Sequence, residues 1–284
     1  IRDSANTPFS AHGLLKLILN RYLRLFAPYA VALIFTIACA YIARLWVNDE
    51  FVGESETLTQ FLAHLFFIQG ILGLDSISAG AWYVAIDWQL YSVLAILFLS
   101  FPSYQALIWL LSIMAVSSLL FFNRSGDYEA YFIYFIGSYG LGVLAYLASG
   151  FQDAGVKRLA KITLILIGLI IATASFQEIW LRNFLAWFVA LALYLWGDTK
   201  YPAMRENASV FKVITWGSQR SYCAFLIHFA FILLANTLYI AFSLHAHESG
   251  TLAIGLMLGV VACSILMANY VYRWVEVPAN KLKV

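Results

Sequence analysis

Charged residues are scarce in this chain. Only 11% of its 284 residues are Asp, Glu, Lys or Arg, whereas 63% are hydrophobic and the mean hydropathy is +0.82. A soluble domain carries about 25% charged residues, so this scarcity excludes an ordinary soluble protein. The sequence therefore indicates an integral membrane protein that has the lipid bilayer as a partner.

Cysteine frameworks, metal-ligand motifs and basic stripes are also lacking. The three cysteines, Cys39, Cys223 and Cys263, are odd in number and lie in apolar runs, which is unlike a disulfide framework. His245 and His247 alternate beside Glu248, a pattern that could bind a metal weakly but favours a solvated loop. We expect no metal and no bound cofactor. The basic residues form no stripe with interleaved aromatic residues, which excludes a nucleic-acid partner.

Long apolar runs stand where the charges are missing. Most are about 17–25 residues long, the length that a spanning α-helix needs, whereas the alternating segments of a transmembrane β-barrel are absent. We therefore expect an all-α transmembrane helix bundle that forms a single membrane domain over residues 1–284. Small residues within it, Gly137, Gly140 and Gly142, predict close helix packing. The eight predicted spans are 23–46, 81–101, 103–122, 129–149, 159–177, 179–196, 221–243 and 251–274.

The basic residues divide unequally between the two sides of this bundle. If the N-terminal side is cytoplasmic, 14 of the 17 Lys and Arg residues fall on the cytoplasmic side, as the positive-inside rule requires. Both ends of the chain are then cytoplasmic, and Arg44, Arg124 and Arg182 are left outside. A further apolar stretch, 58–74, would reverse this bias if it spanned fully. We expect it to be re-entrant or to lie in the outer interface.

One acidic residue, Asp87, lies well inside an apolar span. A carboxylate at membrane depth costs at least ~2.5–3.5 kcal/mol, which suggests a functional site. Tyr83 and Tyr91 are at i−4 and i+4 and share its helix face. Such a carboxylate can orient a hydroxyl, hold an imidazole or carry a proton. The alternative is a structural carboxylate that pairs with an Arg or Tyr of a neighbouring helix.

A histidine and two arginines are the other candidates for chemistry. His228 lies seven residues into the seventh predicted span, where it can act as a general base or bind a ligand, or simply donate one N–H to a carbonyl. Arg21 and Arg24 share a helix face just before the first span and can clamp phosphates, or only anchor the helix end. Arg273 and Glu276, at i and i+3 near the end of the last span, are expected to form an ion pair.

Four short segments together resemble the membrane-bound acyltransferase 3 family, the bacterial O-acyltransferases of glycans. Residues 21–29 resemble its Arg-rich segment that ends in Pro-x-Tyr, and residues 82–91 resemble its tryptophan-to-Val-Glu-Glu-Gln-Phe-Tyr helix. Residues 221–228 are similar to its Ser-Tyr-to-Leu-x-His helix, and residues 272–278 are similar to its closing Glu-x-Pro motif. The segments occur in the order found in the family.

The resemblance implies an enzyme that moves an acyl group, expected to be acetyl, from acyl-CoA to a hydroxyl of a glycan or a lipid-linked sugar. It implies polysaccharide modification by O-acetylation in the bacterial cytoplasmic (inner) membrane. Arg21 and Arg24 would meet the CoA phosphates, and Asp87 would act nearer the outer side on the acceptor hydroxyl, on water or on a proton. His228 and Tyr222 would line the route from the inner side. Aromatic residues near Asp87 would bind substrate: Trp82, Tyr83 and Tyr91.

The chain also departs from the family pattern. Asp87 stands where the family has Glu, Val277 replaces the usual Arg, and Ala230 follows His228-Phe229 where Pro is common. The family's first two helices, the first of which carries an Arg and a catalytic His, have no counterpart in the sequence, so we expect an N-terminally incomplete domain that is inactive alone. Two alternatives stay open. One is a proton-coupled transporter or exporter of glycan or lipid intermediates with Asp87 as its proton site, and the other is a non-catalytic membrane remnant.

Overall fold

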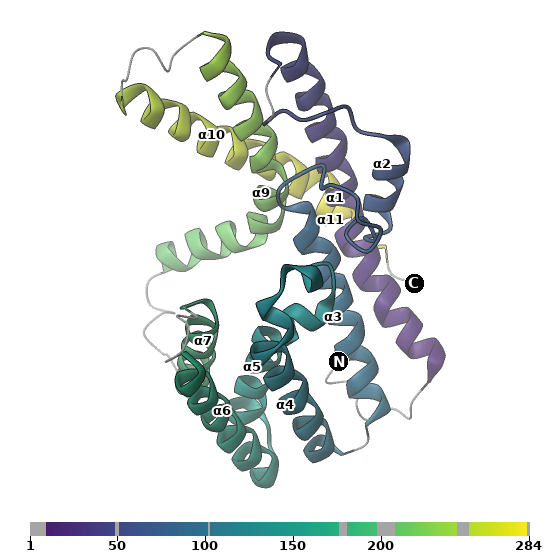
Figure 1. Cartoon of the computed structure of the whole chain (residues 1–284), viewed down its shortest axis with the longest axis vertical. Helices are drawn as coiled ribbons and strands as arrows, with labels where there is room; N and C mark the ends of the chain where they lie inside the picture. Colours follow the sequence, from purple (N-terminus) through teal and green to yellow (C-terminus); the bar gives the residue numbers. More distant parts are fainter. Residues whose placement is uncertain are drawn as a thin grey trace. The chain divides into compact units, whose positions relative to one another are not determined.

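The computed structural model describes residues 10–48, 51–101, 103–175, 181–197, 208–242 and 250–282. Within these ranges the chain forms helices joined by turns and no β-strand (Figure 1). The predicted all-α class is therefore confirmed. His245 and His247 fall outside the described ranges.

Each predicted span overlaps a helix among the described residues. Among the described residues, six helices are long and apolar enough to cross a bilayer, and α7 is a shorter apolar helix, so the full count of eight spans stays a prediction. The helices are α1 Ala11–Trp46, α2 Leu58–Leu65, α3 Ala81–Ser100, α4 Tyr104–Leu120, α5 Phe132–Gly150, α6 Ala154–Ser175, α7 Leu181–Gly197, α9 Ala208–Ala241, α10 Gly250–Val271 and α11 Val277–Ala279.

The first spanning helix, α1, is longer than predicted. It has 36 residues and begins at Ala11, so Arg21 and Arg24 lie within the helix rather than just before it. At 1.5 Å per residue it is ~54 Å long, which exceeds the ~30 Å hydrocarbon core of a bilayer. Hydropathy located only the part that fits the bilayer, because Lys16 and the two arginines interrupt the apolar run of the first turns.

The helix α9 also begins earlier than predicted. The predicted hydrophilic loop 197–220 is helical from Ala208 onward, so Lys212 and Arg220 lie in a helix and not in a loop. Figure 1 shows a change of direction within α9. The helix contains the pair Gly217-Ser218, and Gly/Ser pairs weaken a helix locally.

The ambiguous stretch 58–74 does not form a spanning helix. Its helix α2 has eight residues, against the ~20 that a span needs, and turns follow as far as Gly80. A capping box starts α2: the Thr57 hydroxyl accepts from the Gln60 N–H at 3.1 Å, and the Gln60 side chain accepts from the Thr57 N–H at 3.4 Å. The choice between a re-entrant and an interfacial position stays a prediction.

A buried histidine, His64, ties the two ends of this segment together. Its side chain is 0% exposed, with Nδ1 2.8 Å from the Gln60 carbonyl oxygen and Nε2 3.1 Å from the Ile77 amide nitrogen. Because a carbonyl accepts and an amide N–H donates, Nδ1 carries the proton and Nε2 accepts. Burial lowers the pKa of His64, and the hydrogen bond to Gln60 opposes that shift only in part. The neutral imidazole therefore closes the loop 60–77.

The described helices belong to two compact units. The first comprises Ile1–Ile18 and Ile86–Pro202, and it includes most of α3 together with α4 to α7. Close approach between its helices depends on glycine: a Cβ on Gly137 would lie 2.7 Å from Leu119 Cγ, and one on Gly140 would lie 3.7 Å from the Ala115 Cβ. The predicted close packing is confirmed at Gly137 and Gly140 but not at Gly142, where a Cβ would meet no atom within 4 Å.

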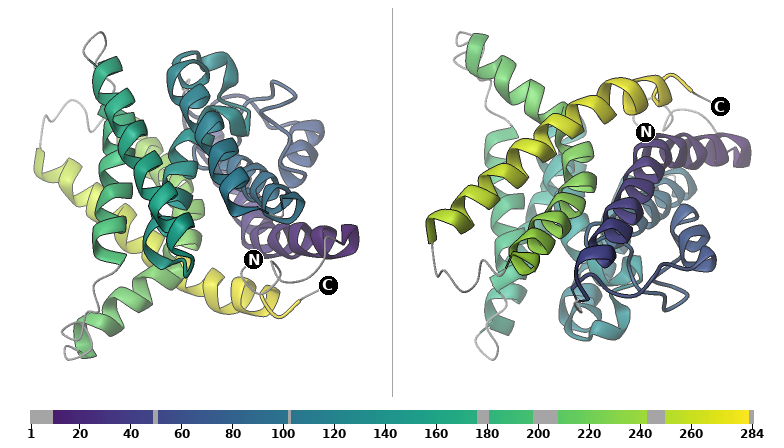
Figure 2. Two further views of the ribbon diagram at one scale, coloured as in Figure 1. Left: turned by 90° about the horizontal axis from the view of Figure 1, so that it is seen from below. Right: turned by 90° about the horizontal axis from the view of Figure 1, so that it is seen from above.

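The second unit comprises Leu19–Ala85 and Ala203–Val284. Here Cys39, Ala40 and Ala43 of α1 form one buried cluster with Ala230 and Leu233 of α9. The helices α9 and α10 also pack along each other (Figure 2). All three cysteines are free.

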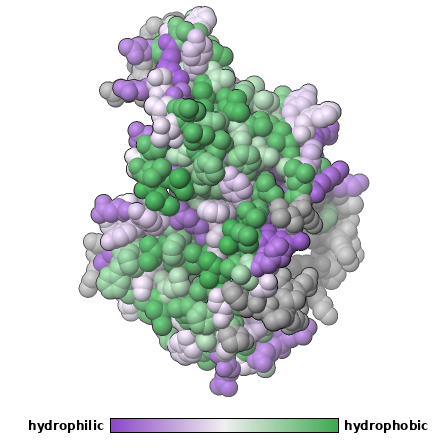
Figure 3. Space-filling model, turned by 90° about the vertical axis from the view of Figure 1, so that its right-hand side faces the viewer, coloured by the Kyte–Doolittle hydropathy of each residue, from purple (hydrophilic) through white to green (hydrophobic). Residues whose placement is uncertain are grey.

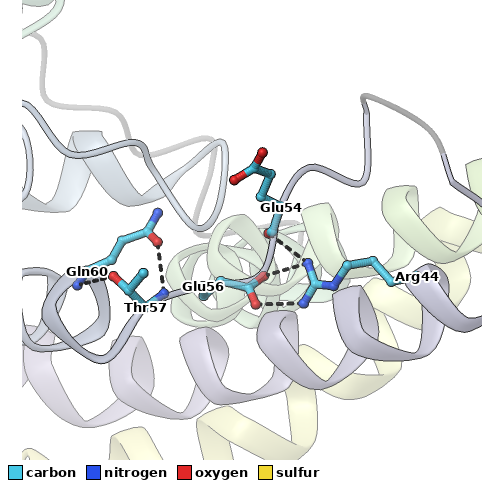
Figure 4. Close-up of polar contacts among 5 residues, drawn as sticks. All are labelled: Arg44, Glu54, Glu56, Thr57 and Gln60. Atoms are coloured by element: carbon cyan, nitrogen blue, oxygen red, sulfur yellow. Dashed lines mark hydrogen bonds and ion pairs between the residues drawn. The ribbon is translucent and has the colours of Figure 1, made fainter.

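An ion pair holds one of the three basic residues that the charge count left on the outer side. Arg44 donates from Nη2 to Glu56 Oε2 at 2.7 Å and from Nη1 to Glu56 Oε1 at 3.2 Å (Figure 4). Its Nη1 also donates to the Glu54 carbonyl at 3.0 Å. Arg182, a second of these residues, is held by hydrogen bonds to neutral groups. It donates to Asn123 Oδ1 at 2.8 Å and to the Tyr134 hydroxyl at 2.9 Å. These exceptions to the charge bias therefore have structural partners.

The surface of the molecule is rich in hydrophobic side chains. They cover much of the face drawn in Figure 3. In the apolar 18-residue stretch of the helical segment Gly250–Ala279, only 11% of the residues are buried. In the corresponding stretch of α5, 50% are buried. Exposed apolar area on this scale is stable only against another apolar phase, as expected of an integral membrane protein.

Candidate active site

The predicted site residues divide between the two units. Asp87 and Tyr91 belong to the first unit, on α3. The other six belong to the second unit, on α1, the start of α3 and α9: Arg21, Arg24, Trp82, Tyr83, Tyr222 and His228. The second unit therefore holds most of the candidate site.

The imidazole of His228 is oriented by its own helix. His228 is half-buried in α9, and its Nδ1 lies 2.7 Å from the carbonyl oxygen of Phe225. Because a carbonyl only accepts, Nδ1 carries the proton, and Nε2 is the basic nitrogen of the neutral ring. The predicted structural role, donation of one N–H to a carbonyl, is thus present at Nδ1. Nε2 retains the capacity to accept a proton.

Aromatic rings connect His228 to the start of α3. The ring of Phe225 lies 5.9 Å from the His228 ring and 5.5 Å from the Tyr83 ring, which is itself 6.0 Å from the Trp82 ring. Gly80 permits this approach, since a Cβ there would lie 3.1 Å from the Phe225 ring. The structure therefore brings three predicted residues into one aromatic run, through a phenylalanine that was not predicted.

A tyrosine on α9 joins the basic turn of α1. The Tyr222 hydroxyl donates to the carbonyl of Leu25 at 3.0 Å, the residue that follows Arg24. Within the same turn, the Tyr22 hydroxyl donates to the last carbonyl of α2 at 2.9 Å. These two bonds fix the rotation of α1, with Arg24 exposed and Arg21 half-buried. The turn can present the Arg24 guanidinium to an anion.

The membrane carboxylate, Asp87, is the seventh residue of α3 and is half-buried. Tyr83 and Tyr91 lie one turn before and after it, as predicted. Its neighbour Gln89 has a structural role. The Gln89 amide donates to a carbonyl just before α5 at 3.1 Å and accepts from the first N–H of α5 at 2.9 Å, so it caps that helix.

The predicted ion pair between Arg273 and Glu276 is not present. Arg273 is exposed, whereas Glu276 is 5% exposed and accepts a hydrogen bond from the thiol of Cys223 at 3.0 Å. The reason is the π-helical turn Tyr272–Glu276. Residues at i and i+3 share a face in an α-helix, but the wider π turn rotates Glu276 inward.

Arg220 clamps α9 to α10 near this turn. It is 8% exposed, and its guanidinium donates from Nε to Asn269 Oδ1 at 2.8 Å and from Nη1 to the Trp216 carbonyl at 2.9 Å. The guanidinium also lies 4.5 Å from the Trp216 ring and 4.7 Å from the Tyr272 ring. A residue that hydropathy assigned to a loop is thus a buried cation with partners on three sides.

A groove of about 720 Å³ runs between α9 and α10, with His228 in its wall. The two helices are antiparallel in the register that the Arg220–Asn269 contact defines, so His228 and Ser264 lie toward one end of the groove. Asn236 and Tyr239 lie toward the other end. The middle is apolar and is formed by Ile232, Leu256, Met257, Val260 and Val261.

The sequence matches a known family over nearly its whole length. The sequence model of the acyltransferase 3 family, described as an acyltransferase domain, matches residues 5–269. The chain belongs to the acyltransferase 3 family. Neither a curated protein nor a solved structure matches it significantly. The protein is therefore a membrane acyltransferase, as the four segments at 21–29, 82–91, 221–228 and 272–278 predicted.

In this acyltransferase, the structure groups some predicted residues and adds others. Tyr83 and His228 meet through Phe225, and Tyr222 meets the basic turn of α1. Phe225 and Ser264 carried no signal of their own, because an aromatic or small residue in an apolar span is ordinary. The position of Phe225 held one clue, because Phe225 precedes His228 by three residues and so shares its helix face.

Proposed function

We propose that this acyltransferase moves an acyl group from acyl-CoA to a hydroxyl of a glycan or a lipid-linked sugar. Its expected site is the bacterial cytoplasmic membrane, with both ends of the chain on the inner face. Acetyl, which the resemblance implies, is the first acyl group to assay. The observation that carries the proposal is the order in which three groups follow one another in the second unit. The Arg24 turn of α1 comes first, Tyr222 of α9 is bonded to that turn, and His228 lies further along α9.

The basic turn of α1 supports a role in binding phosphates. CoA carries several phosphates at one end and the thioester at the other, so its two ends need separate sites. Arg24 is exposed, and Arg21 lies three residues before it. Guanidinium groups bind phosphate oxygens in pairs of hydrogen bonds. Tyr222, which donates to the Leu25 carbonyl, would guide the arm that joins the two ends of CoA.

The imidazole of His228 supports a role in proton transfer. It lies six residues beyond Tyr222, or ~9 Å along α9 at 1.5 Å per residue. The acceptor hydroxyl oxygen would attack the thioester carbonyl carbon, and the hydroxyl proton would pass to Nε2. As the carbon–sulfur bond breaks, the CoA sulfur leaves and takes up that proton. We assign the role of proton acceptor to His228 Nε2.

The carboxylate of Asp87 supports a role toward the acceptor. A carboxylate accepts hydrogen bonds from sugar hydroxyls, and tyrosines stand one turn away on each side. Trp82 and Tyr83 are 44% and 49% exposed, and their rings offer flat apolar faces for a sugar. We assign the acceptor hydroxyl to Asp87, and the sugar ring to these aromatic residues and Tyr91.

The test uses the full gene product in native-like membranes, with labelled acetyl-CoA and a glycan acceptor. We expect Arg24→Gln to raise the KM for acetyl-CoA but not for acetyl-pantetheine, which lacks the nucleotide phosphates. Arg158→Gln removes another exposed basic residue and should leave both values unchanged. We expect His228→Ala to lower kcat by ~100- to 10,000-fold and Asp87→Asn to raise the KM for the acceptor. Wild-type kinetics in all three variants would refute the proposed roles.

A further inference from the structure

We infer that the groove between α9 and α10 binds the acyl chain of the donor, and that the enzyme accepts chains longer than acetyl. The inference rests on the proposed acyl transfer and replaces acetyl by a larger group. It is carried by the size of the groove, its apolar middle and the placement of its polar groups, all within the second unit.

The groove is much larger than a two-carbon group needs. Its volume of about 720 Å³ is in the range of ~300–1,000 Å³ typical of sites for whole small molecules. From Ser264 to Ala253 it follows eleven residues of α10, or ~16 Å at 1.5 Å per residue. One leaflet of a bilayer core is ~15 Å thick, half of the full ~30 Å. The groove therefore matches the length of one membrane-type acyl chain.

The end of the groove near His228 offers a partner for an ester carbonyl. Ser264 is 5% exposed, and its Oγ has no hydrogen-bond partner. A buried hydroxyl without a partner costs ~1–3 kcal/mol, and the methylenes of ordinary membrane lipid cannot relieve it. A thioester carbonyl oxygen placed there would accept from Ser264, on the same end of the groove as the imidazole of His228.

The rest of the groove suits the hydrocarbon that follows such a carbonyl. Beyond Ser264 the walls are Val260, Val261, Leu256 and Ile232, with no charged side chain among the lining residues. On the far side of Ser264, the Arg220–Asn269 contact sets the spacing of the two helices. A chain whose carbonyl lies at Ser264 therefore extends toward Asn236 and Tyr239, away from the clamp.

The test is a series of acyl-CoA donors from acetyl to hexadecanoyl, assayed with the wild type, Val260→Phe and Leu258→Phe in the same membranes. Val260 lines the groove, whereas Leu258 is an exposed residue of the same helix that does not. In the wild type, kcat/KM should rise about fourfold for each methylene that enters the groove, or ~0.8 kcal/mol. Val260→Phe should lower dodecanoyl transfer by roughly 250-fold, the loss of about four buried methylenes, and should lower acetyl transfer far less. Leu258→Phe should match the wild type throughout, which controls for partition of long donors into the bilayer.

A second variant separates the carbonyl from the chain. Ser264→Ala should lower kcat/KM roughly tenfold for every donor, through one lost hydrogen bond, without changing the dependence on chain length. Acetyl transfer without transfer of any longer chain would overturn the inference and leave the proposed function standing. The same holds if Val260→Phe shows the chain-length profile of the wild type. Absence of transfer from every donor would overturn the proposed function itself.

Discussion

Acidification should open the loop 60–77, because its closure depends on a neutral imidazole at His64. The ring donates from Nδ1 to Gln60 and accepts at Nε2 from the N–H of Ile77. Protonation would put a second N–H against that amide and a charge in a fully buried site. Burial lowers the pKa of His64 below its ordinary 6.5. The closed loop therefore binds protons less readily than the open one.

The sign and size of the effect follow from this linkage. The contribution of His64 to closure is fully present above pH 6.5. It is lost as the pH falls through 6.5 toward the lower pKa of the closed loop, because the open loop takes up the proton first. One unpartnered buried N–H costs ~1–3 kcal/mol. Opening of the loop should therefore become about 5- to 150-fold more frequent at low pH.

Hydrogen exchange of the peptide segment 66–80, in a reconstituted bilayer, measures this opening. Rates are compared at two pH values on either side of ~6.5 and corrected for intrinsic exchange. His64→Gln supplies a side-chain acceptor that does not titrate, so its protection should be independent of pH. His12→Gln removes an exposed histidine and should keep the wild-type response. Equal corrected protection of the wild type at both pH values would refute the reasoning.

Two further predictions concern helix packing. Gly168→Ala should lower the thermal midpoint, because its Cβ would lie 2.1 Å from Trp187 Cε2. Overpacking costs ~1–3 kcal/mol. The added methyl group would also strain the 3.0 Å hydrogen bond from Trp187 Nε1 to the Leu164 carbonyl. An unchanged melting curve would contradict this packing. Arg220→Ala should destabilise the enzyme by ~2–4 kcal/mol through lost charged hydrogen bonds and ring contacts, as followed by thermal unfolding. Lys212→Ala, an exposed site of the same helix, serves as the control and should have little effect.

The spans could be predicted from the sequence because apolar length is imposed by the bilayer. The distribution of basic residues between the two sides also predicted that 58–74 does not cross the bilayer, since another span would reverse it. The helix α2 in this stretch is only eight residues long. The ends of α1 and α9 could not be found in this way. Hydropathy measures fit to lipid, whereas a helix continues wherever its backbone bonds are satisfied, inside the bilayer or beyond it. For this reason Arg220 was assigned to a loop.

Polar residues inside apolar runs were predictable only as anomalies. Asp87 and His228 could be singled out by the cost of placing them in lipid, but their partners depend on contacts between helices. His64 shows the limit most clearly: it stands in an apolar stretch without a motif, and its two hydrogen bonds come from backbone groups four and thirteen residues away. The π turn that buries Glu276 likewise has no signature in spacing, because the i, i+3 rule presumes an α-helix.

The distribution of the three free cysteines makes the enzyme suitable for site-specific labelling without mutagenesis. Cys39 and Cys223 are buried, and only Cys263 is exposed. Within this sequence, a membrane-permeant thiol reagent should therefore attach only at Cys263, directly beside Ser264. A fluorophore at Cys263 would sense the polarity and motion of its surroundings next to the groove. Occupancy of that groove could then be followed by fluorescence in the otherwise native enzyme.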